Sequence, residues 1–219
     1  MASDPSPKRS GGPTITVSAN GPYVVRGELT LRRQNGRELE TRRVTALCRC
    51  GHSANKPFCD GSHARQGFAG PETADRGPVS TRHVAYEGRG VTIFDDRSIC
   101  AHAGHCTDSL PQVFRYGEEP WIDPEGAEVD AILTAVARCP SGALSYALGS
   151  GDDPAAPPEG LTITAARNGP LEVRGTVALA SQDGTPYAPR TRFTLCRCGG
   201  SANKPFCDGS HWSRGFTDG

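Results

Sequence analysis

The sequence predicts an α+β protein of three small domains, and three observations support this fold class. Residues 14–68 recur as residues 162–216, at an offset of 148 and without insertion or deletion. Each copy alternates short apolar and polar stretches, broken by Asn-Gly and Gly, as strands and tight turns do. The stretch between the copies carries strand alternation and one helical period. We therefore expect two β-rich repeats around a smaller α+β domain.

Segments rich in proline and glycine divide the chain. We expect a disordered tail over residues 1–13, a first repeat over 14–70, a middle domain over 79–148, a linker over 149–160 and a second repeat over 161–219. Residues 71–78 form a further connection between the first repeat and the middle domain. Domains this short bury little apolar surface, so they usually need a structural metal or a disulfide bond to be stable.

The composition excludes several classes of protein. The nine cysteines are an odd number, and no charged-then-apolar signal segment precedes Pro13, which argues against an exported disulfide protein. The formal net charge is zero and no apolar run is long enough to span a bilayer. We therefore expect a cytoplasmic protein that has neither nucleic acid nor a membrane as a partner.

Each repeat contains the string C-R-C-G-x-S-A-N-K-P-F-C-D-G-S-H. In an extended segment the first two thiols point to the same face. The last thiol and the imidazole are four residues apart, the separation of neighbours on one helical face, and the residues between them suit a turn that enters a helix. Each pair can bind one metal ion, and the start of that helix adds partial positive charge beside it. Thiols and imidazoles this dense indicate iron or zinc. The candidate ligands are Cys48, Cys50, Cys59 and His63 in the first repeat, and Cys196, Cys198, Cys207 and His211 in the second.

This string resembles the motif of the CDGSH iron-sulfur family, and the likeness extends over both repeats. The resemblance implies a [2Fe-2S] cluster in each repeat, held by three cysteines and one histidine, with the iron of Cys59 and His63 nearer to solvent. Family members pair two such units, so the repeats are expected to form a pseudo-dimer within a monomeric chain. Zinc is the rival metal, because three cysteines and one histidine also form an ordinary structural zinc site.

Other residues shared by the two strings have simpler interpretations. The prolines are expected to shape the loop and the lysines to be solvated. The arginines either raise the reduction potential of the clusters or are themselves solvated. These residues are Pro57, Pro205, Lys56, Lys204, Arg49 and Arg197.

The middle domain holds the remaining cysteines, Cys100, Cys106 and Cys139, and the last of these precedes a proline. The segment resembles a divergent ferredoxin with one cluster, in which Ala103 stands where the middle cysteine of the loop belongs. Three thiolates can hold a [3Fe-4S] cluster, which we favour, or a [4Fe-4S] cluster completed by water or an imidazole. His102 and His105 flank the gap and are not assigned as ligands. We expect the order strand, strand, helix, strand, with Trp121 in the core.

The function that follows is electron transfer through three iron-sulfur clusters, with redox proteins as partners. We expect no enzyme activity, because the sequence offers no recognisable nucleophile with its base and no open metal position beside a cleft. Two alternatives remain. One is a sensor or cluster donor, since a histidine ligand is lost on protonation. The other is a structural zinc module for protein interactions.

Overall fold

The computed structural model describes residues 12–149 and 160–218. The expected tail, residues 1–13, and the expected linker, residues 149–160, lie almost entirely outside these described residues. Within them, no helix is long and apolar enough to cross a membrane. The chain is mixed α+β, so the predicted fold class is confirmed.

The two repeats form equivalent sets of short strands, and a single helical turn follows the last strand of each set. Alternate strand residues are buried, as in Ile15 and Val17, which matches the alternation of the sequence. The first repeat contains β1 (Thr14–Val17), β2 (Tyr23–Arg26), β3 (Thr30–Arg33), β4 (Glu38–Leu39), β5 (Val44–Leu47) and α1 (Ser62–Arg65). The second contains β9 (Thr162–Ala165), β10 (Leu171–Arg174), β11 (Ala178–Ser181), β12 (Arg192–Leu195) and α4 (Ser210–Ser213).

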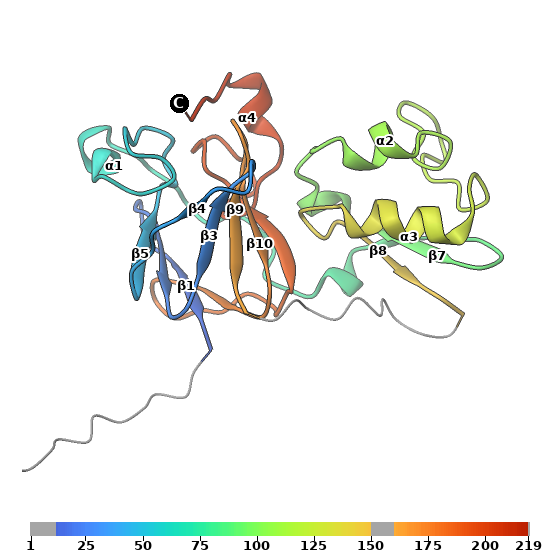
Figure 1. The fold of residues 1–219 in the computed structure, drawn as a ribbon, viewed down its shortest axis with the longest axis horizontal. Coiled ribbons are helices and arrows are strands. Elements are labelled where there is room, and N and C mark those ends of the chain that lie inside the picture. The colour runs from blue at the N-terminus through green and yellow to red at the C-terminus, as the bar shows by residue number, and fades with distance from the viewer. Residues whose placement is uncertain (1–11, 150–159, 219) are drawn as a thin grey trace, which may run out of the picture.

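The repeats exchange strands, a feature that their sequences do not reveal. One sheet has the order β11-β1-β2-β5 and the other has the order β12-β10-β9-β3-β4. Strand β3 therefore pairs in parallel with β9 of the second repeat, and β11 pairs in parallel with β1 of the first. Each sheet contains strands of both repeats, as Figure 1 shows for β3 beside β9. The pseudo-dimer is thus a single folded body with one shared core.

The repeats also meet where their metal-binding strings begin. An isolated antiparallel bridge joins Cys50 to Cys198. Gly51 follows with a φ of 85°, and a Cβ atom there would lie 2.8 Å from the carbonyl oxygen of Cys198. A Cβ atom on Gly199 would likewise lie 2.7 Å from the carbonyl oxygen of Cys50. Only glycine accepts both this backbone conformation and this close approach, which explains the C-x-C-G pattern of each repeat.

The middle domain is a three-stranded antiparallel sheet covered by one main helix. Its elements are β6 (Val84–Glu87), β7 (Thr92–Asp95), α2 (His105–Ser109), α3 (Val129–Ala137) and β8 (Leu144–Ala147), with 3-10 turns at Val79–Thr81 and Arg97–Ile99. The sheet order is β6-β7-β8. The expected order of strand, strand, helix, strand is present, with α2 as an unpredicted addition. Trp121 is half-buried and packs 5.8 Å from the ring of Phe114, at the border of the core.

The middle domain lies beside the second repeat, on the side away from α1 (Figure 1). Residues 71–78, expected as a plain connection, are fastened to that repeat. The carboxylate of Glu72 accepts hydrogen bonds from the hydroxyls of Tyr187 and Ser181, each at 2.7 Å. The backbone N–H groups of Thr73 and Ala74 donate to the carbonyl of Lys204 at 2.8 and 3.0 Å. These bonds hold the approach of the chain to the middle domain in one position.

Candidate metal centres

The first repeat brings its four predicted ligands together as two pairs. The Sγ atoms of Cys48 and Cys50, at the end of β5, lie 3.9 Å apart. The Sγ of Cys59 lies 3.4 Å from the Nδ1 of His63. Both cysteines of the first pair are buried, at 1% and 5% exposure, whereas Cys59 and His63 are half-buried. The geometry therefore agrees with the expected split into an inner and an outer pair.

The second repeat reproduces this arrangement closely. The Sγ atoms of Cys196 and Cys198 are 3.8 Å apart, and the Sγ of Cys207 is 3.4 Å from the Nδ1 of His211. Its outer pair is more enclosed, because His211 is only 4% exposed. The two sites thus share their ligand geometry but differ in their access to solvent.

Loop N–H groups point at the outer sulfur atoms. The N–H of Gly61 lies 3.5 Å from the Sγ of Cys59, and the N–H of Gly209 lies 3.5 Å from the Sγ of Cys207. The helices α1 and α4 contain four residues each, so their dipoles contribute less than the expected helix would. Direct N–H donors in the loop supply the partial positive charge instead.

An aspartate fixes each of these loops. The carboxylate of Asp60 accepts hydrogen bonds from the N–H groups of Ala54 and Ser62, both at 2.9 Å. Asp208 does the same for Ala202 at 2.7 Å and Ser210 at 3.0 Å. The aspartate of the motif therefore joins the two halves of the loop and sets the position of the following histidine.

Each repeat presents its ligands as two separate pairs, and each pair can bind one metal ion. Burial raises the pKa of Cys207 to about 12. A thiolate enclosed in this way needs the positive charge of nearby metal ions.

The interpretation of Arg49 and Arg197 as solvated side chains is wrong, because each is 1% exposed. Their alternative role, an effect on the reduction potential of the clusters, stays a prediction. Arg49 donates to the carbonyls of Ser18 and Gly70, while Arg197 pairs with Asp218 at 2.8 Å. The alternating strand that points the thiols to one face turns these arginines into the opposite, buried face.

Lys204 is also not solvated. It is 9% exposed, and its ammonium group donates to the carbonyl of Ser201. Lys56, its equivalent, is half-buried. The difference arises because residues 71–78 pack over the second repeat, and the carbonyl of Lys204 accepts two of their N–H groups.

The three cysteines of the middle domain line one pocket of about 780 Å³. Ala103 lines it as well, at the position where the loop lacks a cysteine, and so do both unassigned histidines, His102 and His105. Burial raises the pKa of Cys100, and raises that of Cys106 to about 11. The Sγ of Cys139 lies 3.6 Å from the hydroxyl of Ser141. The three thiols are thus near enough to one another to interact electrostatically, with Ala103 in the same lining.

The middle pocket adjoins the metal site of the second repeat. His102 has a φ of 51°, and its ring lies 3.0 Å from where a Cβ atom on Gly209 would be. Its carbonyl accepts a hydrogen bond of 3.2 Å from the indole N–H of Trp212. Burial is the main cause of the raised pKa of Cys207, and the charge of Cys100 acts in the same direction. Sequence reasoning missed this contact, because no pattern links His102 to Trp212.

Comparisons with known proteins agree with the ligand patterns. Residues 20–64 and 168–212 match the family described as iron-binding zinc finger, CDGSH type. Residues 86–149 match the family described as divergent 4Fe-4S mono-cluster. The uncharacterized protein YjdI of Escherichia coli strain K12 is 33% identical over 72 residues, which cover 33% of this chain and 95% of YjdI. YjdI of strain O157:H7 gives the same values. The chain therefore belongs to the CDGSH iron-binding family, with one CDGSH domain on each side of a divergent 4Fe-4S mono-cluster domain.

Proposed function

We propose that the protein is an electron carrier with two [2Fe-2S] clusters and one [3Fe-4S] or [4Fe-4S] cluster. The ligands of the [2Fe-2S] clusters are Cys48, Cys50, Cys59 and His63, and Cys196, Cys198, Cys207 and His211. Those of the third cluster are Cys100, Cys106 and Cys139. A reducing compartment such as the cytoplasm suits this donor set, since all nine cysteines are free thiols.

One observation carries the proposal, namely the packing of the middle pocket against the second CDGSH site. His102 forms one wall of this contact, and Gly209 and Trp212 form the other. Bound clusters would accept and release single electrons at these sites. Because the three sites share one chain, each has a high effective concentration for its neighbour, which favours transfer within the molecule.

Other residues keep the sites suited to this task. Burial keeps water away from the sulfur atoms of the inner cysteines. The loop N–H groups of Gly61 and Gly209 stabilise negative charge on the sulfur atoms of the outer cysteines. The described residues contain no group that we assign to substrate chemistry, and we propose that the protein acts as a carrier and not as an enzyme. Its partners are then redox proteins.

The experiment is metal and sulfide analysis of protein purified without oxygen, followed by a redox titration monitored by electron paramagnetic resonance. We expect about seven irons per chain with a [3Fe-4S] middle cluster, or about eight with [4Fe-4S], and three one-electron transitions. Stoichiometric zinc with little iron would refute the proposal and favour the structural zinc module.

A second candidate function is cluster donation from the first CDGSH site. It is favoured by the half-buried state of His63, compared with 4% exposure of His211. Incubation of the loaded protein with an apo-ferredoxin distinguishes the two functions. A carrier keeps its iron through repeated reduction and oxidation, whereas a donor passes a [2Fe-2S] unit to the acceptor without redox turnover.

A further inference from the structure

The second repeat holds the middle domain through donors that bind backbone carbonyls. Arg192 donates to the carbonyls of Val136 and Ala137 at 3.2 Å, and to that of Leu144 at 3.0 Å. Two of these acceptors are at the C-terminal end of α3, where a helix carries partial negative charge. Asn203 donates from Nδ2 to the carbonyl of Ser98 at 2.7 Å. This face of the second repeat is therefore built for a ferredoxin-like domain.

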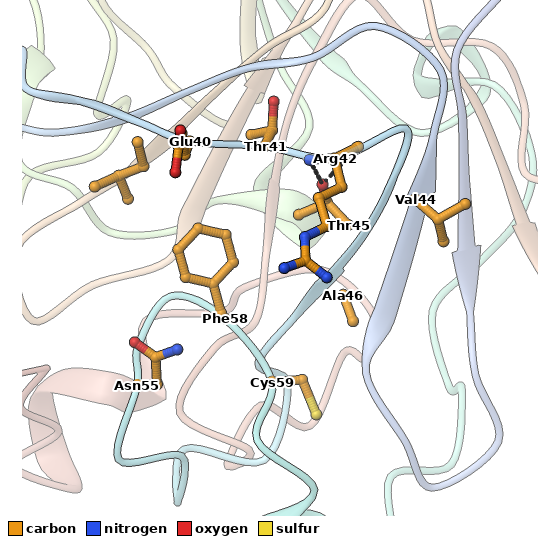
Figure 2. A pocket seen from close by; sticks show the side chains of 10 residues that line it. Glu40, Thr41, Arg42, Val44, Thr45, Ala46, Asn55, Phe58 and Cys59 are labelled. Carbon is orange, nitrogen blue, oxygen red and sulfur yellow. Dashed lines mark hydrogen bonds between the residues drawn. The ribbon is translucent and has the colours of Figure 1, made fainter.

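The same face exists on the first repeat, where the middle domain does not cover it. The offset of 148 residues relates Arg174, Arg190, Asn203, Phe206 and Cys207 to Arg26, Arg42, Asn55, Phe58 and Cys59. An open pocket of about 730 Å³ is lined by four of them, Arg42, Asn55, Phe58 and Cys59, as Figure 2 shows. The residue types of this face, two arginines, an asparagine, a phenylalanine and a ligand cysteine, are thus retained.

Several side chains of this first-repeat face are free to bind a partner. Within residues 12–149 and 160–218, no hydrogen bond or ion pair involves the side chains of Arg26, Arg42 or Asn55. All three residues are exposed. Val44, which corresponds to Arg192, is 48% exposed in the strand beside Arg26. The face therefore combines unpaired donors with one exposed apolar side chain.

The first repeat keeps two of the donors that hold the middle domain on the second repeat, since Arg174 donates to the carbonyl of Ala137 and Asn203 to that of Ser98, and their equivalents are Arg26 and Asn55. Only Arg192 is replaced, by Val44. Valine cannot replace Arg192 as a donor to three carbonyls, so the two faces are related but not interchangeable. The middle domain of a second copy of this chain is in turn held by its own second repeat. A separate protein is therefore the occupant that suits the open face.

We propose that the first-repeat face, formed by Arg26, Arg42, Val44, Asn55 and Phe58, is the docking site for a separate ferredoxin-type [4Fe-4S] protein. This inference rests on the electron-carrier function proposed above. The occupant of the equivalent face is itself a mono-cluster 4Fe-4S domain, which gives the chemistry of the partner. Because Cys59 lines the pocket, a docked ferredoxin would lie close to the outer ligands of the first site. One electron leaves the reduced partner and enters the first site, and no bond forms or breaks.

The test measures binding and electron transfer separately, with a single-cluster bacterial [4Fe-4S] ferredoxin as the probe. Calorimetry with both proteins oxidised gives the affinity, and stopped-flow mixing with reduced ferredoxin gives the second-order rate constant. Val44→Glu should weaken binding about tenfold or more and slow the reaction similarly, since it buries a charge against the partner. Arg42→Glu, on the same face, provides a second variant if Val44→Glu fails to retain its clusters.

The matched control is Leu148→Glu, a change from an apolar residue to glutamate at a position that is 39% exposed, directly after β8 of the middle domain. It should leave affinity and rate unchanged. Loss of binding in Leu148→Glu but not in Val44→Glu would assign docking to the middle domain and overturn the proposal. A dimer that Val44→Glu dissociates in sedimentation would assign the face to a second copy and would also overturn it.

The remaining outcomes separate this inference from the proposed function. Wild-type protein that dithionite reduces, but that neither binds nor oxidises the ferredoxin, overturns the docking site and leaves the carrier function intact. Wild-type protein without a reducible cluster overturns the carrier function itself. Normal cluster content in Val44→Glu, together with wild-type affinity, refutes the docking site alone.

Discussion

Tyr23→Phe tests whether the two repeats support each other's metal sites. Tyr23 belongs to the first repeat and is fully buried, yet its hydroxyl donates to the carbonyls of Cys196 and Pro205 at 2.8 and 3.0 Å. The Pro205 carbonyl also accepts the N–H of Cys196 at 2.8 Å, so it keeps a donor when the hydroxyl is removed. The Cys196 carbonyl is the acceptor that loses its hydrogen bond. A buried acceptor without its donor costs about 2 kcal/mol.

The assay is thermal unfolding of the cluster-loaded protein at a fixed scan rate, followed by circular dichroism and visible absorbance. For a chain of this length, a loss of about 2 kcal/mol lowers the apparent midpoint by roughly 4–8 °C. We expect the visible absorbance to disappear with the fold, because Tyr23 holds the backbone of a ligand cysteine. The change removes one oxygen atom and keeps the ring, so it leaves no large cavity.

Tyr116→Phe is the matched control, because Tyr116 is 92% exposed and the same atom is removed from a solvated ring. It should leave the midpoint within about 1 °C of the wild type, as surface substitutions usually do. A midpoint of Tyr23→Phe equal to that of the control would refute the view that the first repeat stabilises the second site through this hydroxyl.

Two further predictions concern the middle pocket and a buried ion pair. Ala103→Cys should complete a four-cysteine set, add about one iron per chain and remove the resonance signal of an oxidised [3Fe-4S] cluster, while the signals of both reduced [2Fe-2S] clusters stay unchanged; unaltered iron content would contradict the proposed position of the fourth ligand. Asp218→Asn leaves the buried Arg197 without its carboxylate, which costs about 3 kcal/mol and lowers the apparent midpoint by roughly 6–12 °C. The exposed Glu28→Gln should have no such effect, and equal midpoints for these two variants would show that the ion pair contributes nothing measurable.

Local sequence was sufficient to predict the ligand pairs. Alternation along an extended segment places Cys48 and Cys50 on one face. Cys59 precedes α1, and the turn at Asp60 and Gly61, not a shared helical face, brings His63 to it; neither pair requires knowledge of the rest of the chain. The same holds for the order of elements in the middle domain, since α3 follows from apolar residues at helical spacing. Patterns of this kind depend on contacts between residues a few positions apart.

The environment of Arg49 and Arg197 could not be predicted in the same way. An arginine between two ligand cysteines is polar in any sequence scale, and only the folded chain shows that carbonyls and, for Arg197, Asp218 surround it. The loop carbonyls that bind Arg49 belong to Ser18 and Gly70, which are far from it in sequence. Burial of a charge depends on partners that local patterns do not specify.

The sequence by itself therefore determined the family and the residues that pair in each candidate site, because these depend on residue type and short spacing. Only the tertiary structure decided that β3 and β11 cross between the repeats, and that the middle domain covers one of two related faces. Both results depend on contacts between segments that are distant along the chain, and the repeats are nearly identical in their local patterns. A few differences, such as Val44 against Arg192, make the two faces unequal, and their effect is visible only where the middle domain packs.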